Sequence, residues 1–276
     1  MYYILNAAIK GVLEGFTEFL PISSTGHLVL VRDLLPLTEN AAQAKRLDDL
    51  FDIVIQFPAV LAIVILYRKR LTESVLGITK KKESKRFWTG LFVAFLPVAM
   101  LGMLCKDWIE KYLMFPKPIA LALIAGGLIL ILIERSSLRE SIASAESVPL
   151  STALAIGVFQ CLGMIPGTSR SGATIVGGRM LGLSRTAAAE YSFFLALPTM
   201  AGAFTYKFLK AMRQQQIHWD TDGAVLLVGC ATSFLTAWAV VSVFMRMIES
   251  KHGLSMWGWY RIALGGLVLL LGTSKT

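Results

Sequence analysis

The sequence has little charge for its length. Of its 276 residues, 16% are charged and 55% are hydrophobic, and its mean hydropathy is +0.63. Such a composition excludes an ordinary soluble domain, in which about 25% of residues are charged. It is typical of an all-α polytopic membrane protein, and we expect residues 1–276 to form a single membrane domain.

Cysteine is also scarce, and a pattern typical of a secretory leader is not seen in the first residues. Cys105, Cys161 and Cys230 are far apart and lie in apolar runs, which excludes a disulfide framework or a zinc site of known spacing. We expect them to be small buried hydrophobic residues. The first residues show no basic segment followed by a small-residue cleavage pattern, so a cleaved signal peptide is not expected.

Acidic residues are fewer than basic ones, 18 against 27, which gives a formal charge of +9. A basic balance can indicate nucleic-acid binding. Here, however, the excess of Lys and Arg over Asp and Glu is concentrated in residues 68–86, between two hydrophobic spans. Because basic loops of membrane proteins stay in the cytoplasm, we place this loop there and expect no nucleic-acid partner.

Polar side chains gather in one otherwise apolar segment near the start of the sequence. Ionisable groups at membrane depth are costly and are kept where they function. Glu14 and Glu18 are four residues apart, so they share one face of a helix with Lys10. Pro21 should end that helix, and the Ser-Ser-Thr-Gly run should cap a second helix that starts near His27. The segment is predicted to be a helical hairpin with a polar tip.

A second segment, residues 157–174, repeats this order of Gly-Val-apolar-Glu/Gln, a proline, and a tip rich in hydroxyl groups and glycine. Residues 126–132 also resemble residues 265–271, and residues 56–59 weakly resemble residues 196–199. These likenesses predict an internal repeat, with repeat one at about 1–133 and repeat two at about 150–272.

Each repeat is predicted to hold one re-entrant hairpin and three transmembrane helices. Three is odd, so the second repeat should be inverted relative to the first. The hairpins then enter from opposite sides, and their tips meet at one shared cavity, because irregular backbone at this depth must be shielded from lipid. Residues 32–49 are predicted to be an exposed loop. The six spans are predicted at residues 51–67, 87–105, 118–133, 187–209, 224–247 and 257–272.

Residues 14–27 (EGFTEFLPISSTGH) and 166–174 (PGTSRSGAT) resemble the two signature motifs of the bacterial undecaprenyl-diphosphatases, the bacitracin-resistance type of polyprenyl-pyrophosphate phosphatase. The resemblance runs nearly end to end. It implies two re-entrant hairpins within an interdigitated inverted repeat, with active-site groups from both. It also implies hydrolysis of undecaprenyl diphosphate to undecaprenyl phosphate and inorganic phosphate, which recycles the lipid carrier for peptidoglycan synthesis.

The same resemblance implies a magnesium or calcium requirement. It also implies a site open to the periplasmic side of the bacterial cytoplasmic membrane. The expected partners are therefore a polyprenyl diphosphate lipid and the bilayer, and the sequence carries no indication of an oligomeric state. Lys10 is not part of the family motif.

Arg170 needs an anion at membrane depth, and its planar guanidinium matches a phosphate. Neighbouring hydroxyl groups and helix amides add donors. Alternatively, Arg170 pairs with Glu14 or Glu18 and holds the repeats together, and both roles can coexist if the pair opens when phosphate arrives. The substrate-binding residues are predicted to be Ser23, Thr25, Ser169, Arg170, Ser171 and Thr174. Of these, Ser23 and Thr25, like Gln160, are expected to act mainly as capping or supporting groups.

Glu14 and Glu18 suit a divalent ion that bridges diphosphate oxygens, because hard cations prefer carboxylates and phosphates. One of them could instead be a general base, or Lys10 could neutralise Glu14. Ser24 and His27 are three residues apart, near enough for His27 to take the serine proton. His27 could also protonate a leaving group, activate water or only cap a helix. The predicted catalytic residues are Glu14, Glu18, Ser24, His27 and Arg170, with either Ser24 or water as nucleophile.

Two other functions fit parts of the pattern. Inverted repeats with broken helices near the midplane also build secondary transporters, so a lipid flippase is the alternative function. A packing role would explain the glycines and serines. It would leave the two glutamates, the histidine and the arginine without a purpose.

Overall fold

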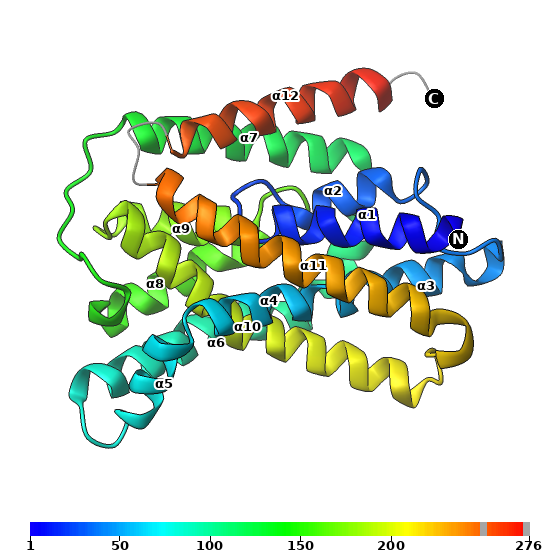
Figure 1. Cartoon of the computed structure of the whole chain (residues 1–276). Helices are drawn as coiled ribbons and strands as arrows, with labels where there is room; N and C mark the ends of the chain where they lie inside the picture. Colours follow the sequence, from blue (N-terminus) through cyan, green and yellow to red (C-terminus); the bar gives the residue numbers. More distant parts are fainter. Residues whose placement is uncertain (249–252, 273–276) are drawn as a thin grey trace.

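The computed structural model describes residues 1–248 and 253–272, and these residues form a bundle of helices (Figure 1). The helices are α1 (Tyr2–Thr17), α2 (Ser24–Val31), α3 (Ala41–Val54), α4 (Gln56–Leu66), α5 (Arg68–Leu76), α6 (Lys82–Tyr112), α7 (Pro116–Arg135), α8 (Leu150–Cys161), α9 (Arg170–Met180), α10 (Arg185–Arg213), α11 (Trp219–Ile248) and α12 (Ser255–Gly272). Two short 3₁₀ turns, Ala145–Ser147 and Leu162–Met164, flank α8. The predicted all-α class is confirmed.

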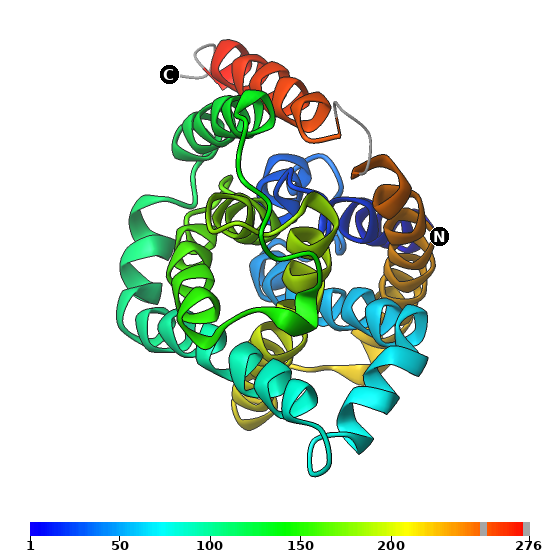
Figure 2. The same cartoon turned by 90° about the vertical axis from the view of Figure 1, so that its left-hand side faces the viewer.

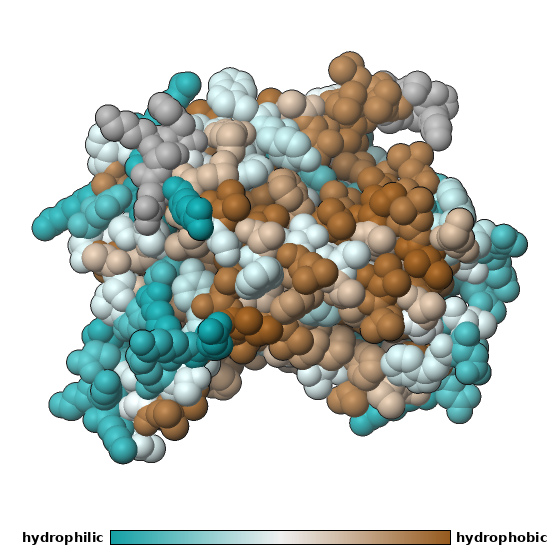
Figure 3. Space-filling model, viewed as in Figure 1, coloured by the Kyte–Doolittle hydropathy of each residue, from teal (hydrophilic) through white to brown (hydrophobic). Residues whose placement is uncertain are grey.

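Four helical stretches of the described chain are long and apolar enough to cross a membrane: Ala42–Leu66, Lys82–Tyr112, Pro116–Arg135 and Trp219–Ile248. Hydrophilic side chains gather toward the two ends of these helices, with a hydrophobic surface between them (Figure 3). The protein is therefore a multi-pass membrane protein. Four of the six predicted spans fall on these stretches. The other two fall on α10 and α12, which are not among the four, and they stay predictions.

Helices from the two predicted repeats pack against each other. α1 lies along α11, α8 lies along α6, and α7 and α12 form a pair at one edge of the molecule (Figures 1 and 2). Matched glycines permit the first two contacts, because a Cβ at Gly11 would lie 2.4 Å from the carbonyl oxygen of Gly229, and one at Gly157 would lie 2.4 Å from that of Ala94. Interdigitated repeats would give this pairing of helices. The inverted orientation of the second repeat relative to the first stays a prediction.

The first hairpin differs from its predicted boundaries. α1 already ends at Thr17, before Pro21, and α2 starts at Ser24 rather than near His27. The carbonyl groups between the two helices are used elsewhere, since that of Leu20 accepts a hydrogen bond from the second tip and that of Pro21 accepts one from α12. The first helix therefore ends four residues before Pro21, and the proline is not what ends it.

The predicted exposed loop at residues 32–49 is wrong in its second half, where α3 begins. Asn40 caps this helix by accepting a hydrogen bond from the amide of Ala42. Leu47 is buried, and so is Asp48, which accepts a hydrogen bond from Lys10 at 2.6 Å. The acidic and basic residues here looked solvated in the sequence, but some of them pair across the bundle.

An ion cluster within the basic loop joins α5 to the 3₁₀ turn before α8 and to α10. Arg70 hydrogen-bonds the carboxylates of both Glu146 and Glu190. Burial tends to raise the pKa of Glu146, but hydrogen bonds from Arg70 and Ser144 outweigh it and hold the pKa below its usual value. A carboxyl group whose pKa falls on folding stabilises the fold above its unfolded pKa, and this contribution is lost on acidification.

The cysteines differ from their expected burial. All three are free thiols, as predicted, but each is only half-buried. They lie on helices whose faces are partly turned outward, so full burial was the wrong expectation.

Candidate active site

The tips of the two hairpins are in direct contact. The hydroxyl of Ser171 donates to the carbonyl oxygen of Leu20 at 2.8 Å, and Nη2 of Arg170 lies 2.9 Å from Oε1 of Glu18. These contacts join positions about 150 residues apart in the chain. The prediction that the tips meet is confirmed, whereas a shared cavity between them stays a prediction.

The same strained cap starts the second helix of each hairpin. Ser23 precedes α2 with φ 72°, and Ser169 precedes α9 with φ 73°. Each serine hydroxyl accepts a hydrogen bond from the amide three residues later, that of Gly26 or Gly172. Such φ values are uncommon for residues other than glycine and often occur at functional sites. Both serines therefore act as caps, as expected for Ser23.

Glu18 links a hydroxyl on one tip to a guanidinium on the other. Its Oε2 accepts a hydrogen bond from Oγ of Ser24 at 2.5 Å, while its Oε1 accepts the hydrogen bond from Arg170. Nη1 of Arg170 also donates to the carbonyl oxygen of Ser192 at 2.9 Å. A carboxylate in this position can take the serine proton, and the guanidinium holds the carboxylate in place.

Neither ring nitrogen of His27 is hydrogen-bonded to Ser24, so the predicted serine–histidine pair is wrong. Nδ1 of His27 lies 2.7 Å from the carbonyl oxygen of Ser23. A carbonyl can only accept, so Nδ1 carries the proton, and in the neutral ring Nε2 accepts the hydrogen bond from the hydroxyl of Tyr260, also at 2.7 Å. The backbone at Ser23 thus turns the imidazole toward α12, and Glu18 takes the place next to Ser24.

The hydroxyl groups predicted to bind phosphate mainly hold the second tip together. Ser171 is engaged by the first tip, as described above. Thr174 donates to backbone carbonyl groups one turn earlier and lies 2.7 Å from Oγ of Ser192 on α10. Thr25 is half-buried and makes none of these contacts. The amides of Gly172 and Ala173 are bonded to Ser169. The donors left for an anion at this tip are therefore the guanidinium of Arg170 and the first amides of α9, those of Arg170 and Ser171.

Glu14 is the buried acidic group that lacks a partner. It is 0% exposed, and neither carboxylate oxygen has a hydrogen-bond partner in the described chain. Lys10 pairs with Asp48, so the alternative in which Lys10 neutralises Glu14 is wrong. Gln160 occupies the position of Glu14 in the second hairpin, and its side chain is hydrogen-bonded to α6 and α10.

The arrangement of the two glutamates fits a divalent cation. Glu14 interacts electrostatically with Glu18, and two neighbouring buried carboxylates repel unless a cation or proton lies between them. No group of three or more His, Cys, Asp or Glu side chains in the described residues could hold a metal by itself. A magnesium-type ion would therefore need oxygen atoms from a bound phosphate as further ligands, as is usual for this ion.

Two site residues on α12 were missed in the sequence. Tyr260 bonds His27, and Arg261 donates to carbonyl groups of both tips. An arginine in an apolar span is a signal that could have been used. A tyrosine near the end of a span gives no such signal, because aromatic residues are common at the membrane interface.

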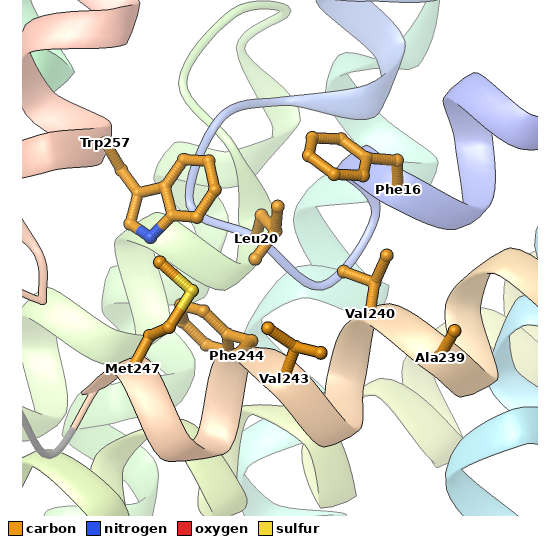
Figure 4. Close-up of a pocket in the computed structure, with 8 residues that line it drawn as sticks. All are labelled: Phe16, Leu20, Ala239, Val240, Val243, Phe244, Met247 and Trp257. Atoms are coloured by element: carbon orange, nitrogen blue, oxygen red, sulfur yellow. The ribbon is translucent and has the colours of Figure 1, made fainter.

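An apolar groove of about 220 Å³ opens beside the first tip. Phe16 and Leu20 form one side, and α11 forms the other (Figure 4). Trp257 of α12 closes one end of it. Leu20 belongs to both groove and tip, since its carbonyl oxygen accepts the hydrogen bond from Ser171. A hydrocarbon chain in this groove would lie close to the polar tips.

Comparisons with known proteins agree on one family. The family model "Bacitracin resistance protein BacA" matches residues 7–267. The chain is 43% identical over 273 residues, covering 99% of this chain and 96% of the relative, to a protein of Nitrosospira multiformis named undecaprenyl-diphosphatase. A Pseudomonas putida protein of the same name is 44% identical over 96% of this chain and 92% of its own length. Undecaprenyl-diphosphatase 3 of Acinetobacter baylyi is 42% identical over 96% of this chain and 97% of its own length.

Proposed function

The chain belongs to the bacitracin resistance protein BacA family, and we propose that it hydrolyses undecaprenyl diphosphate to undecaprenyl phosphate and inorganic phosphate. The names of its relatives support this reaction. The observation that carries it is the contact of Glu18 with Ser24 and with Arg170 of the opposite tip. These three side chains supply a nucleophile, a base and an anion-binding group at one point.

The substrate has two chemically different parts, and the site offers a place for each. Arg170 and the amides of the first turn of α9 suit the diphosphate. The apolar groove beside Leu20 suits the first prenyl units of the lipid chain, and the rest of the chain would stay in the bilayer. A substrate whose headgroup is charged and whose tail is hydrocarbon fits this neighbourhood better than a soluble phosphate ester does.

The first step is assigned to Ser24 and Glu18. Oγ of Ser24 attacks the terminal phosphorus while its proton passes to Oε2 of Glu18, which lies 2.5 Å away. The bond between this phosphorus and the bridging oxygen breaks, and undecaprenyl phosphate leaves with the electron pair. Water then attacks the phosphoserine and gives up a proton. The bond between phosphorus and Oγ of Ser24 breaks, Glu18 returns its proton to Oγ, and inorganic phosphate leaves.

Arg170 couples substrate binding to this step. In the resting structure its Nη2 donates a hydrogen bond to Oε1 of Glu18. When the guanidinium turns to the diphosphate, it gives up this hydrogen bond, and the Glu18 carboxylate keeps Ser24 as its partner. The serine proton is therefore taken most readily when phosphate is in place.

Glu14 and Glu18 would hold the divalent ion, magnesium or calcium, that the family resemblance implies. When bound, the ion would neutralise phosphate charge as it develops. The orphaned carboxylate of Glu14 supports this assignment.

His27 and Tyr260 are assigned to proton exchange in the second step. His27 is buried, whereas Tyr260 is 41% exposed, so the tyrosine hydroxyl connects the imidazole to the surface. The attacking water can give its proton to the oxygen of Tyr260 while the tyrosine hydroxyl passes its own proton to Nε2 of His27.

Tyr260→Phe is expected to lower kcat by about tenfold, because it removes the hydrogen-bond partner of His27 Nε2 and keeps the ring. The pH dependence of kcat should change with it. Steady-state phosphate release between pH 5 and 9 measures both quantities. Tyr206→Phe, at an exposed position on α10, is the control and should behave like the unmodified protein. An unchanged kcat and pH profile in Tyr260→Phe would remove the tyrosine from the mechanism.

The proposed setting is the cytoplasmic membrane of a bacterium, with the site reached from the periplasmic side. The basic loop at residues 68–86 supports this orientation, because such loops stay in the cytoplasm. The names of the relatives favour hydrolysis over lipid transport.

The reaction is tested with purified protein in detergent and undecaprenyl diphosphate in the presence of Mg²⁺. We expect release of one inorganic phosphate per lipid and, after an acid quench, a phosphoryl adduct on Ser24 detected by mass spectrometry. Ser24→Ala should abolish both. Phosphate release without an adduct under single-turnover conditions would assign the attack to water, and no release at all would contradict the proposed reaction.

A further inference from the structure

The side chain of Arg261 lies inside the protein, where α12 meets both tips. It is 1% exposed, and each of its five N–H groups has an acceptor. Nη1 donates to the carbonyl oxygens of Pro21 and Thr168 at 2.9 Å each, Nη2 donates to those of Gly167 at 2.9 Å and Ala122 at 3.1 Å, and Nε donates to that of Leu123 at 3.2 Å. Because a guanidinium carries five N–H donors, its capacity is fully used.

All five acceptors are backbone carbonyl groups, and the ion pairs found among the described residues do not include Arg261. A buried charge without an acidic partner is costly, and a hydrophobic residue would usually serve packing better. The carbonyl dipoles offset part of that cost. The positive charge itself remains next to the two tips, where a diphosphate would bind.

Two glycines leave room for this guanidinium. A Cβ on Gly126 of α7 would lie 2.0 Å from Nη2 of Arg261, and a Cβ on Gly172 would lie 3.2 Å from Nη1. Gly172 is in the first turn of α9, next to the amides that suit phosphate. The guanidinium therefore lies against the first turn of α9, the proposed anion site. The two glycines have no side chain that would displace it.

We propose that Arg261 is a positioning residue of the hydrolysis. By binding Pro21 on the first tip and Gly167 and Thr168 on the second, it fixes the separation of the tips and hence of Glu18 and Arg170. Its charge adds to the positive end of α9, where the diphosphate binds. The reaction it serves is the proposed function, whereas its hold on the two tips can be measured without any turnover.

Arg261→Lys tests this role, because lysine keeps the charge but has three donors and cannot reach five carbonyl groups. We expect kcat to fall about 100-fold, the loss typical of catalytic groups misplaced by about 1 Å. KM should change little, since the lipid chain binds outside the tips. Hydrogen exchange at residues 18–27 and 165–174, followed by mass spectrometry in the absence of substrate, should become faster.

Gly126→Ala provides a second test that keeps the arginine and displaces it. Its matched control is Gly258→Ala, because a Cβ there would lie 2.7 Å from the carbonyl oxygen of Gly127 and crowd the same pair of helices without striking the guanidinium. We expect both variants to melt at a lower temperature, but only Gly126→Ala to lose kcat and to speed exchange at the tips.

The outcomes separate the two proposals. If the unmodified protein releases no phosphate, the proposed function fails, and the exchange data alone decide the role of Arg261. If kcat and exchange at the tips are unchanged in Arg261→Lys or in Gly126→Ala, or if Gly258→Ala loses as much kcat as Gly126→Ala, the positioning role is wrong. Where Arg261→Lys is not recovered folded, Gly126→Ala decides.

Discussion

Replacing Arg170 with lysine is expected to slow phosphate release from undecaprenyl diphosphate by about a thousandfold, within the range measured for arginines that stabilise a transferring phosphoryl group. The purified variant should remain folded, because lysine still fits beside Glu18 and keeps one positive charge there. Stopped assays of inorganic phosphate at saturating lipid measure the loss in kcat directly.

The size of this effect follows from the two contacts that Arg170 makes at once. One Nη group donates to Glu18 and the other to the carbonyl oxygen of Ser192. A planar guanidinium can exchange these contacts for two phosphate oxygens, whereas an ammonium group binds as a point charge. Lysine would therefore neither bind the diphosphate in a fixed orientation nor release Glu18 as a base at the right moment.

Arg179→Lys is the matched control, because Arg179 is also buried on α9 but pairs with Glu140 and the carbonyl oxygen of Leu183, away from the tips. We expect it to lose stability and keep kcat within about threefold of the unmodified protein, as for substitutions outside a site. Comparable kcat losses in both variants would show that general loosening of α9, rather than phosphate binding, explains the effect of Arg170→Lys.

Much of the site could be predicted because ionisable residues in apolar segments are conspicuous. Glu14, Glu18 and Arg170 each stood out for this reason, and the likeness between the two hairpins predicted that their tips would meet. Asp48 could not be found in this way, because it lies among other charged residues that look solvated, and only the packing of α3 against α1 brings it to Lys10.

The partner of Ser24 could not be predicted for a different reason. The spacing of Ser24 and His27 suggested a pair, but side-chain direction at the tip depends on the left-handed backbone at Ser23, which local propensity disfavours. This conformation lets the Ser23 carbonyl bind the imidazole and turns Ser24 toward Glu18. Hydrogen bonds from α9 and α12 hold the preceding residues Leu20 and Pro21, so the conformation of this tip depends on the whole fold.

Replacing Glu14 with glutamine is expected to have opposite effects with and without a divalent ion. In EDTA the variant should melt at a higher temperature than the unmodified protein, because it removes one of two neighbouring buried carboxylates that repel each other. With Mg²⁺ and inorganic phosphate the order should reverse, because the unmodified protein gains stability from the bound ion. At a hundred times Kd that gain is about 2.7 kcal/mol, and the variant should lack most of it.

The corresponding shift in melting temperature is about 5–10 °C for the unmodified protein, at about 2–4 °C per kcal/mol. It is measured by thermal unfolding in detergent with inorganic phosphate present as Mg²⁺ is added. The control is Glu146→Gln, which weakens the ion cluster with Arg70, makes no contact with Glu14 or Glu18, and should keep the full Mg²⁺ shift. If Glu14 only packs, the melting temperature should not depend on Mg²⁺ in the unmodified protein or in Glu14→Gln. A metal-binding role predicts that the shift is lost in Glu14→Gln alone, and that phosphate release then requires much higher Mg²⁺, because one carboxylate must hold the ion against the diphosphate unaided.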